Sequence, residues 1–105
     1  MLLTKRKHPK TDEVTYQYVR WTPDGRSVSN VFVCADRIEV DDSDCHTSPT
    51  AGAAVEWFTP TYEATFRRGS GGFPAEALAW LRARFGEAVA AEVEEVLGDP
   101  DAFRA

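Results

Sequence analysis

The densest group of side chains that could do chemistry lies in the Asp41–His46 segment, where three carboxylates, a thiol and an imidazole occupy six positions. Carboxylate oxygens bind hard divalent cations, and thiolate or imidazole groups bind zinc. If the segment is extended, Asp44 and His46 point to the same side. The only other histidine is His8, and the spacing differs from the D-x-[DN]-x-[DN]-G pattern of calcium loops. A small metal-binding protein or enzyme that uses Asp41–His46 is therefore an alternative, and we assign no metal ligand, cofactor or catalytic residue.

Cys45 and His46 also suggest a thiolate–imidazolium pair, but neighbours in an extended chain point to opposite sides, and no third residue is identified that would orient them. The second cysteine, Cys34, lies in an apolar run and is expected to be a buried core thiol. No C-x-x-C pair occurs, so zinc-ribbon and thioredoxin-like sites have no support. We expect reduced thiols in the cytoplasm, whereas an oxidising compartment would allow a bridge between Cys34 and Cys45.

Arg67 and Arg68 precede a connector with three glycines, which leads into a predicted helix and could offer backbone N–H groups to an anion. The Walker A pattern is absent. The first ten residues carry four positive charges, at Lys5, Arg6, Lys7 and Lys10. Nucleic-acid or phosphate-ligand binding through this arm and Arg67 and Arg68 is the first alternative, ahead of the metal or enzyme hypothesis, and it predicts that these residues converge with Arg20 and Arg26 on one face. The net charge of −5 argues against nucleic-acid binding by the whole surface.

Aromatic and acidic side chains instead suggest a protein partner. Trp21 borders a turn and Trp57 a proline bend, so both are expected to be partly exposed, and such aromatics anchor either cores or interfaces. Residues 87–101 carry six acidic side chains and no positive one. The predicted partner-binding residues are Trp21, Trp57, Tyr62, Arg67, Arg68, Glu87, Glu92, Glu94 and Glu95.

Alternating apolar and polar residues predict four strands ahead of the helical segment. They cover residues 14–21, 27–35, 37–41 and 53–68, the last bent at Pro60, which cannot donate a ladder hydrogen bond. Pro23, Asp24 and Gly25 predict a tight hairpin turn between the first two strands. Residues 42–52 carry almost no large apolar side chain and are predicted to form a mobile loop.

Phe73–Leu97 is the one long stretch with helical periodicity. Its apolar stripe contains Leu78, Leu81, Phe85, Val89, Val93 and Val96. Gly86 interrupts it, so the segment is either one helix of about 24 residues, about 36 Å long at 1.5 Å per residue, or two short helices. We favour a break, because a small sheet is too short to cover the longer helix. Gly98 and Pro100 end the segment.

The order of these elements predicts an α+β domain: a mostly antiparallel four-stranded meander with the helical segment packed on one face. Residues 1–12 are predicted to be a flexible basic arm and residues 13–105 a single domain. The other face of the sheet, with Thr15, Gln17, Glu63, Thr65 and Arg67, is expected to be exposed or to form an interface. No apolar run is long enough to span a membrane. The predicted function is a small non-enzymatic protein-interaction module that docks on a partner protein or self-associates, such as an accessory or inhibitor protein of a larger complex.

Overall fold

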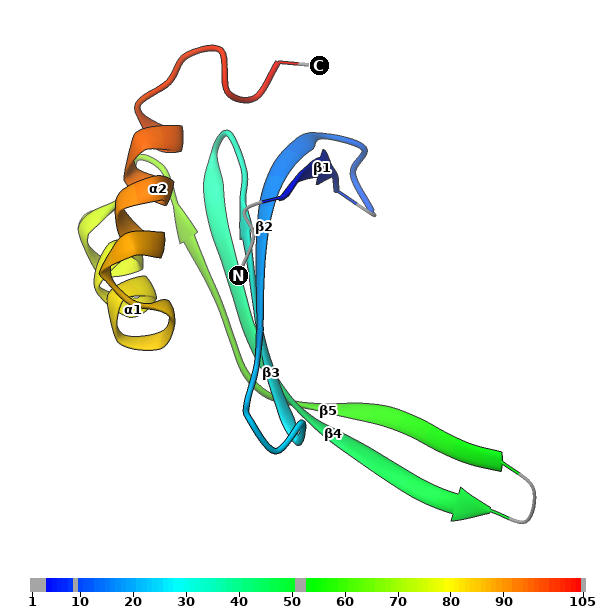
Figure 1. The fold of residues 1–105 in the computed structure, drawn as a ribbon. Helices are drawn as coiled ribbons and strands as arrows, with labels where there is room; N and C mark the ends of the chain where they lie inside the picture. The colour runs from blue at the N-terminus through cyan, green and yellow to red at the C-terminus, as the bar shows by residue number, and fades with distance from the viewer. Residues whose placement is uncertain (1–3, 9, 51–52, 105) are drawn as a thin grey trace.

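The computed structural model describes residues 4–8, 10–50 and 53–104 and forms an α+β domain. Its sheet is antiparallel, and each strand pairs with the next one in the sequence. The strands are β1 (Thr4–Lys7), β2 (Val14–Trp21), β3 (Ser27–Val33), β4 (Arg37–Thr50) and β5 (Ala53–Arg67). Two helices, α1 (Ala75–Phe85) and α2 (Glu87–Leu97), cover one face of this sheet, and the opposite face, here called the open face, has no helix over it (Figure 1).

The predicted count of four strands is wrong by one, because part of the basic arm forms β1. The sequence TKRK has no apolar residue, and all four side chains are exposed. It joins the sheet through its backbone, with Thr4 opposite Gln17 and Lys7 opposite Val14. Its side-chain contacts are also polar, since Lys5 donates to the carbonyl of Arg104 and Arg6 to Gln17, so this edge strand leaves no hydrophobic pattern in the sequence.

The predicted mobile loop at 42–52 is also wrong over its described part, because residues 42–50 belong to β4. They pair antiparallel with β5, with His46 opposite Trp57 and Thr47 opposite Glu56. Ladder hydrogen bonds join backbone groups, so a polar segment forms a strand when its partner strand lies beside it. Residues 51 and 52 lie outside the described part of the chain.

A β-bulge bends this long hairpin. Asp42 pairs with Tyr62 while Ser43 pairs with Pro60, so Thr61 is the extra residue on β5. Bulges bend a sheet and increase its twist. The prediction of a single strand bent at Pro60 is confirmed. Beyond the bulge, β4 and β5 project away from the helices, toward the side of the open face (Figure 1); we call this projecting part of the hairpin the arm.

The core lies between the helices and the sheet face that they cover. The sheet contributes Tyr18, Val31, Val33, Ile38 and Val40, all at most 3% exposed. Leu81 of α1 and Val93 of α2 are fully buried against this face. Burying one such aliphatic side chain stabilises the fold by about 1.5–3 kcal/mol. The predicted stripe is therefore the main partner of the sheet.

Gly86 breaks the helical segment, as we favoured. Its backbone angles are φ 96° and ψ 171°, a region that is accessible in practice only to glycine. The reversal lets both halves of the stripe face the same short sheet. None of the helices in the described residues is long and apolar enough to cross a membrane.

We predict that Gly86→Ala destabilises the protein by about 1–3 kcal/mol, because a Cβ atom disfavours this backbone conformation. No neighbouring atom lies within 4 Å of the added Cβ, so the cost is conformational and not a clash. Gly98→Ala is the matched control, because Gly98 has φ −87° and ordinary contacts, and this substitution should change stability by less than about 1 kcal/mol. Urea unfolding of the two variants measures both values; equal effects would contradict the prediction.

Candidate functional site

The most exposed aromatic side chains of the sheet gather on the open face where the arm begins. Trp21 is 48% exposed and Phe58 is 50% exposed, and their ring centroids lie 6.1 Å apart. Val28 pairs with Trp21 and is 5% exposed, while Val19 on β2 is 38% exposed. We call Val19, Trp21, Val28 and Phe58 the aromatic patch.

Strand alternation and the bulge place these residues on one face. Val19 and Trp21 follow Thr15 and Gln17 along the same side of β2. The extra residue at the bulge shifts the alternation of β5, so that Phe58 lies on the open face as Glu63 does. Sequence reasoning missed Phe58, because its side depends on this shift.

Trp57 and Tyr62, which were predicted to act together with Trp21, lie on the other side of the sheet. Trp57 is 46% exposed and stacks on His46 at 5.3 Å. Tyr62 is 41% exposed and stacks on Trp80 of α1 at 6.3 Å. The arm therefore carries exposed aromatic rings on both of its faces.

The glutamates of α2 were predicted to lack positive partners, and the structure corrects this prediction. Arg82 of α1 lies 2.9 Å from Glu87 and 3.9 Å from Glu94. Glu92 accepts a hydrogen bond from the hydroxyl of Tyr18. Only the turn at Gly86 brings Arg82 beside α2, so spacing along the sequence does not reveal these pairs. Glu95 is exposed on the same helix.

The arginines that were predicted to converge are spread over the molecule. Arg68 donates to the carbonyl of Leu97 at 3.1 Å and lies over the ring of Phe73. Arg20 donates to a carbonyl at the end of α1, and Arg26 lies in the turn between β2 and β3. Arg67 lies at the opposite end of the sheet from that turn, on the open face. The arrangement does not form one phosphate-binding surface.

The Asp41–His46 segment lies within β4, where its carboxylates have local partners. Asp42 pairs with Arg84 at 2.9 Å, and Asp44 accepts from the hydroxyl of Ser27 at 2.9 Å. Cys45 and His46 are consecutive strand residues and point to opposite faces. In the described ranges, no group of three or more His, Cys, Asp or Glu side chains is placed to hold a metal ion.

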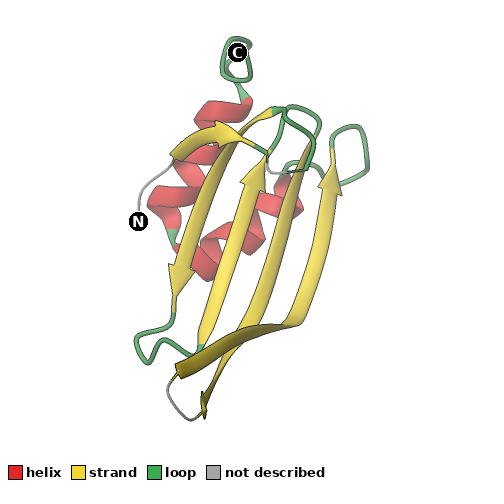
Figure 2. Ribbon diagram, turned by 90° about the vertical axis from the view of Figure 1, so that its right-hand side faces the viewer, coloured by secondary structure: helices red, strands yellow, loops and turns green. Residues whose placement is uncertain are grey.

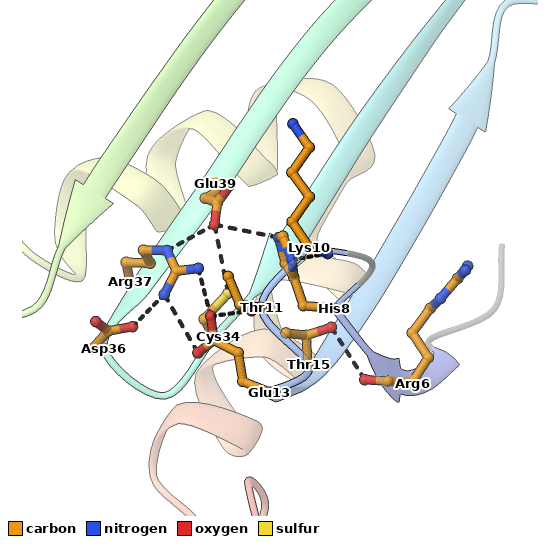
Figure 3. A network of polar contacts seen from close by, with 10 residues as sticks. All are labelled: Arg6, His8, Lys10, Thr11, Glu13, Thr15, Cys34, Asp36, Arg37 and Glu39. Carbon is orange, nitrogen blue, oxygen red and sulfur yellow. Dashed lines mark hydrogen bonds and ion pairs between the residues drawn. The ribbon is translucent and has the colours of Figure 1, made fainter.

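The most connected polar group is centred on Arg37 (Figure 3). Its guanidinium donates to Glu13, Asp36 and Glu39, each at 2.7 Å. Figure 3 also shows His8, whose Nε2 lies 3.7 Å from Glu39. Hydrogen bonds from Arg37 and Thr11 hold the pKa of Glu13 below its ordinary value. The network ties the β1–β2 connection to the β3–β4 turn, which is a structural role.

Beside this network the open face has a depression with a volume of about 300 Å³. Its lining includes Phe32, Glu39, Asp41 and Glu63. Asp41 and Glu63 lie directly opposite each other on β4 and β5, and like charges in that position destabilise a sheet. Burial and the nearby Glu63 carboxylate raise the pKa of Asp41.

Comparison of the chain with protein-family models, with curated proteins and with solved structures finds no match. The functional argument therefore depends on the surfaces described above. Of these, the aromatic patch is the one whose exposed side chains, Val19, Trp21 and Phe58, have no intramolecular polar role.

We predict that Arg37→Met lowers stability at neutral pH by about 1.5–3 kcal/mol, because its charge-assisted hydrogen bonds to three carboxylates are lost. Since the folded-state pKa of Glu13 is depressed, its stabilising contribution is complete above its ordinary pKa of 4.5 and is lost as pH falls through the lower folded value. The variant should therefore lose less stability than the wild type when pH falls below 4.5. Urea unfolding across this pH range measures both effects.

The control is Arg104→Met, which removes an exposed ion pair with Asp101 and should cost less than about 1 kcal/mol. An unchanged acid dependence in Arg37→Met would show that the network does not set it.

We predict that the two cysteines differ sharply toward a thiol reagent. Cys34 is fully buried, and burial raises its pKa to about 12, whereas Cys45 is half-buried. Cys45 lies eight positions beyond Arg37, the neighbour of Cys34, which is roughly 26 Å of extended strand and too far for a disulfide. The reagent should label one thiol quickly and the second only at the rate of unfolding, and Cys45→Ser should abolish the fast phase. Fast labelling of Cys45→Ser would contradict the assignment.

Proposed function

We propose that the chain is a non-enzymatic docking module that binds a partner protein through the aromatic patch at the base of the arm. The observation that carries the proposal is the exposure of Trp21 and Phe58, at 48% and 50%, side by side over the buried Val28. Trp side chains are enriched among the residues that dominate binding energy, because a large ring buries much apolar area with few rotatable bonds.

The shape of the molecule supports the same surface. The arm bends to the side of the open face, so the patch lies at the inner side of a bend and not on a convex ridge (Figure 1). A two-stranded ribbon is marginally stable by itself. A partner seated against the arm would cover the apolar rings and support the ribbon.

The charges around the patch indicate the chemistry of the partner. Asp41, Glu56 and Glu63 lie on the open face near the patch, and the chain has a net charge of −5. Complementary charge favours association and register. The proposed partner therefore presents an apolar segment flanked by Lys or Arg side chains.

This partner chemistry suits a small accessory or inhibitor protein that docks on a larger complex. We place the module in the cytoplasm, because the two cysteines are free thiols and lie too far apart to bridge. Nucleic-acid or phosphate binding and metal or enzyme chemistry, the two alternatives, have less support, because the arginines are scattered and the carboxylates of Asp42 and Asp44 have internal partners.

The test is photo-crosslinking in cells that naturally produce the chain. A benzophenone amino acid in place of Phe58 should give a covalent adduct with a discrete protein, and the crosslinked peptide should carry basic residues beside the attachment point. Adding Trp21→Ser should lower the adduct yield roughly tenfold or more, since it removes the neighbouring anchor.

The matched control carries the benzophenone in place of Tyr62, which is similarly exposed but lies on the helix side. It should not give the same adduct. Equal adducts from both positions, or an adduct that is insensitive to Trp21→Ser, would overturn the proposal.

A further inference from the structure

The edge formed by β5 is a second surface, separate from the aromatic patch. β5 is the last strand of the sheet and forms its free right-hand edge in Figure 2. The backbone N–H of Arg68 donates to the carbonyl of Asp36 at 2.9 Å, so these two residues, next to the ends of β5 and β4, form a hydrogen-bonded pair. Pairs alternate along an antiparallel ladder, so Phe66 and Ala64 also bond to β4. The N–H and C=O groups of Thr65 and Glu63, and the N–H of Arg67, therefore point to the free edge.

The side chains of these same residues carry an uneven charge pattern. Glu63, Thr65 and Arg67 lie on the open face and are exposed. Across the ladder Glu63 faces Asp41, and Arg67 faces Arg37, so each end of this stretch sets like charges opposite each other. Within the part of the chain that the structure describes, neither Glu63 nor Arg67 forms an ion pair with an opposite charge.

We propose that the chain forms a symmetric dimer by antiparallel pairing of β5 with β5 of a second copy about a two-fold axis at Thr65. This register places Glu63 of each copy opposite Arg67 of the other. Asp41 and Glu63 of one copy then lie in the same row across the strands as Arg67 and Arg37 of the second copy. The two-fold axis repeats this row, so it occurs once on each side of the axis. Self-complementarity of this kind is what a two-fold interface requires.

The backbone agrees with this register. In it Thr65 of one copy is opposite Thr65 of the other, and the outward N–H of Arg67 meets the outward carbonyl of Glu63. These are the groups that the ladder on β4 leaves at the edge. The carbonyl of Arg67 already accepts from the N–H of Ser70 at 3.1 Å, so the pairing ends there.

The helix side of the edge is suited to the same contact. Ala64 and Phe66 are half-buried and belong to the border of the core. In the proposed register Phe66 lies beside Ala64 of the second copy, which extends the apolar layer across the axis. Charged side chains, a proline or a bulge usually protect an edge strand. In β5, Pro60 and the bulge precede the stretch from Tyr62 to Arg67, and the two charges of that stretch, Glu63 and Arg67, have opposite signs and can pair with a second copy.

The dimer goes beyond the proposed docking function, because it uses the edge of β5 and leaves the aromatic patch free. Sedimentation equilibrium over a concentration series tests it. Glu63→Arg and Arg67→Glu should each weaken dimerisation on the order of 10- to 100-fold, since each places like charges across the axis. The double swap Glu63→Arg with Arg67→Glu should restore it. Glu63→Arg relieves the like-charge pair with Asp41 within the monomer, so a loss of dimer in this variant would not arise from unfolding.

Amide hydrogen exchange measures the backbone pairing between the two copies directly. Amide exchange of Thr65 and Arg67 should slow as concentration rises, while Ala64 and Phe66, which bond to β4, should stay protected throughout. Thr65→Pro removes an outward N–H and should abolish the dimer with little change in the monomer.

Two results would overturn the dimer. One is a monomer at the highest soluble concentration, with rapid exchange at Thr65. The other is a dimer that survives both single charge substitutions but is lost in Trp21→Ser with Phe58→Ser, which would assign self-association to the aromatic patch. The first result leaves the crosslinking of a different protein at Phe58 unaffected, and the second would instead predict an adduct of the chain with itself there, so the failure of the dimer and the failure of the docking function can be told apart.

Discussion

The packing of the helical stripe on one face of the sheet is the interaction on which the rest of the structure depends. Leu81 and Val93 are buried against Val31 and Ile38, so this face of each strand is fixed. Because strand side chains alternate with a period of two, fixing one face also fixes the other. Trp21 therefore lies on the open face because the opposite face of β2 is fixed by the core, and not because contacts of its own ring hold it there.

The bulge at Asp42 and Ser43 modifies this rule locally and gives the molecule its second feature, the arm. Without the extra residue, Phe58 would fall on the helix side and the aromatic patch would lose half of its rings. The bulge also separates two environments on β5. Its first part belongs to a two-stranded ribbon, and its last part, from Tyr62 to Arg67, belongs to the five-stranded sheet.

The elements that the sequence predicts well are those with a strong local pattern. The stripe from Leu78 to Val96, the break at Gly86 and the bend at Pro60 each follow from residue type and spacing, and the structure has all three. The strand β1 and the second half of β4 could not be found in this way. Their residues are polar, and they are held by backbone hydrogen bonds to strands that lie beside them only in the folded chain.

The candidate site shows the same division. The exposure of Trp21 and Trp57 follows from their places beside a turn and a bend. That these two rings lie on opposite faces, and that Phe58 joins Trp21, depends on the bulge. The pairing of Arg82 with Glu87 and Glu94 depends on the reversal at Gly86. Such contacts arise from tertiary placement, which charge patterning along the chain does not contain.

The chain order of this fold has a consequence for its biosynthesis. Every strand pairs with its neighbour in the sequence, so the loops that must close are short and the entropy lost on closing them is small. The strands can therefore begin to pair as β5 leaves the ribosome, before α1 and α2 have emerged to cover them. Until they emerge, the apolar face that includes Val31 and Ile38 faces water, and a nascent chain with such a face is open to aggregation or to capture by a chaperone.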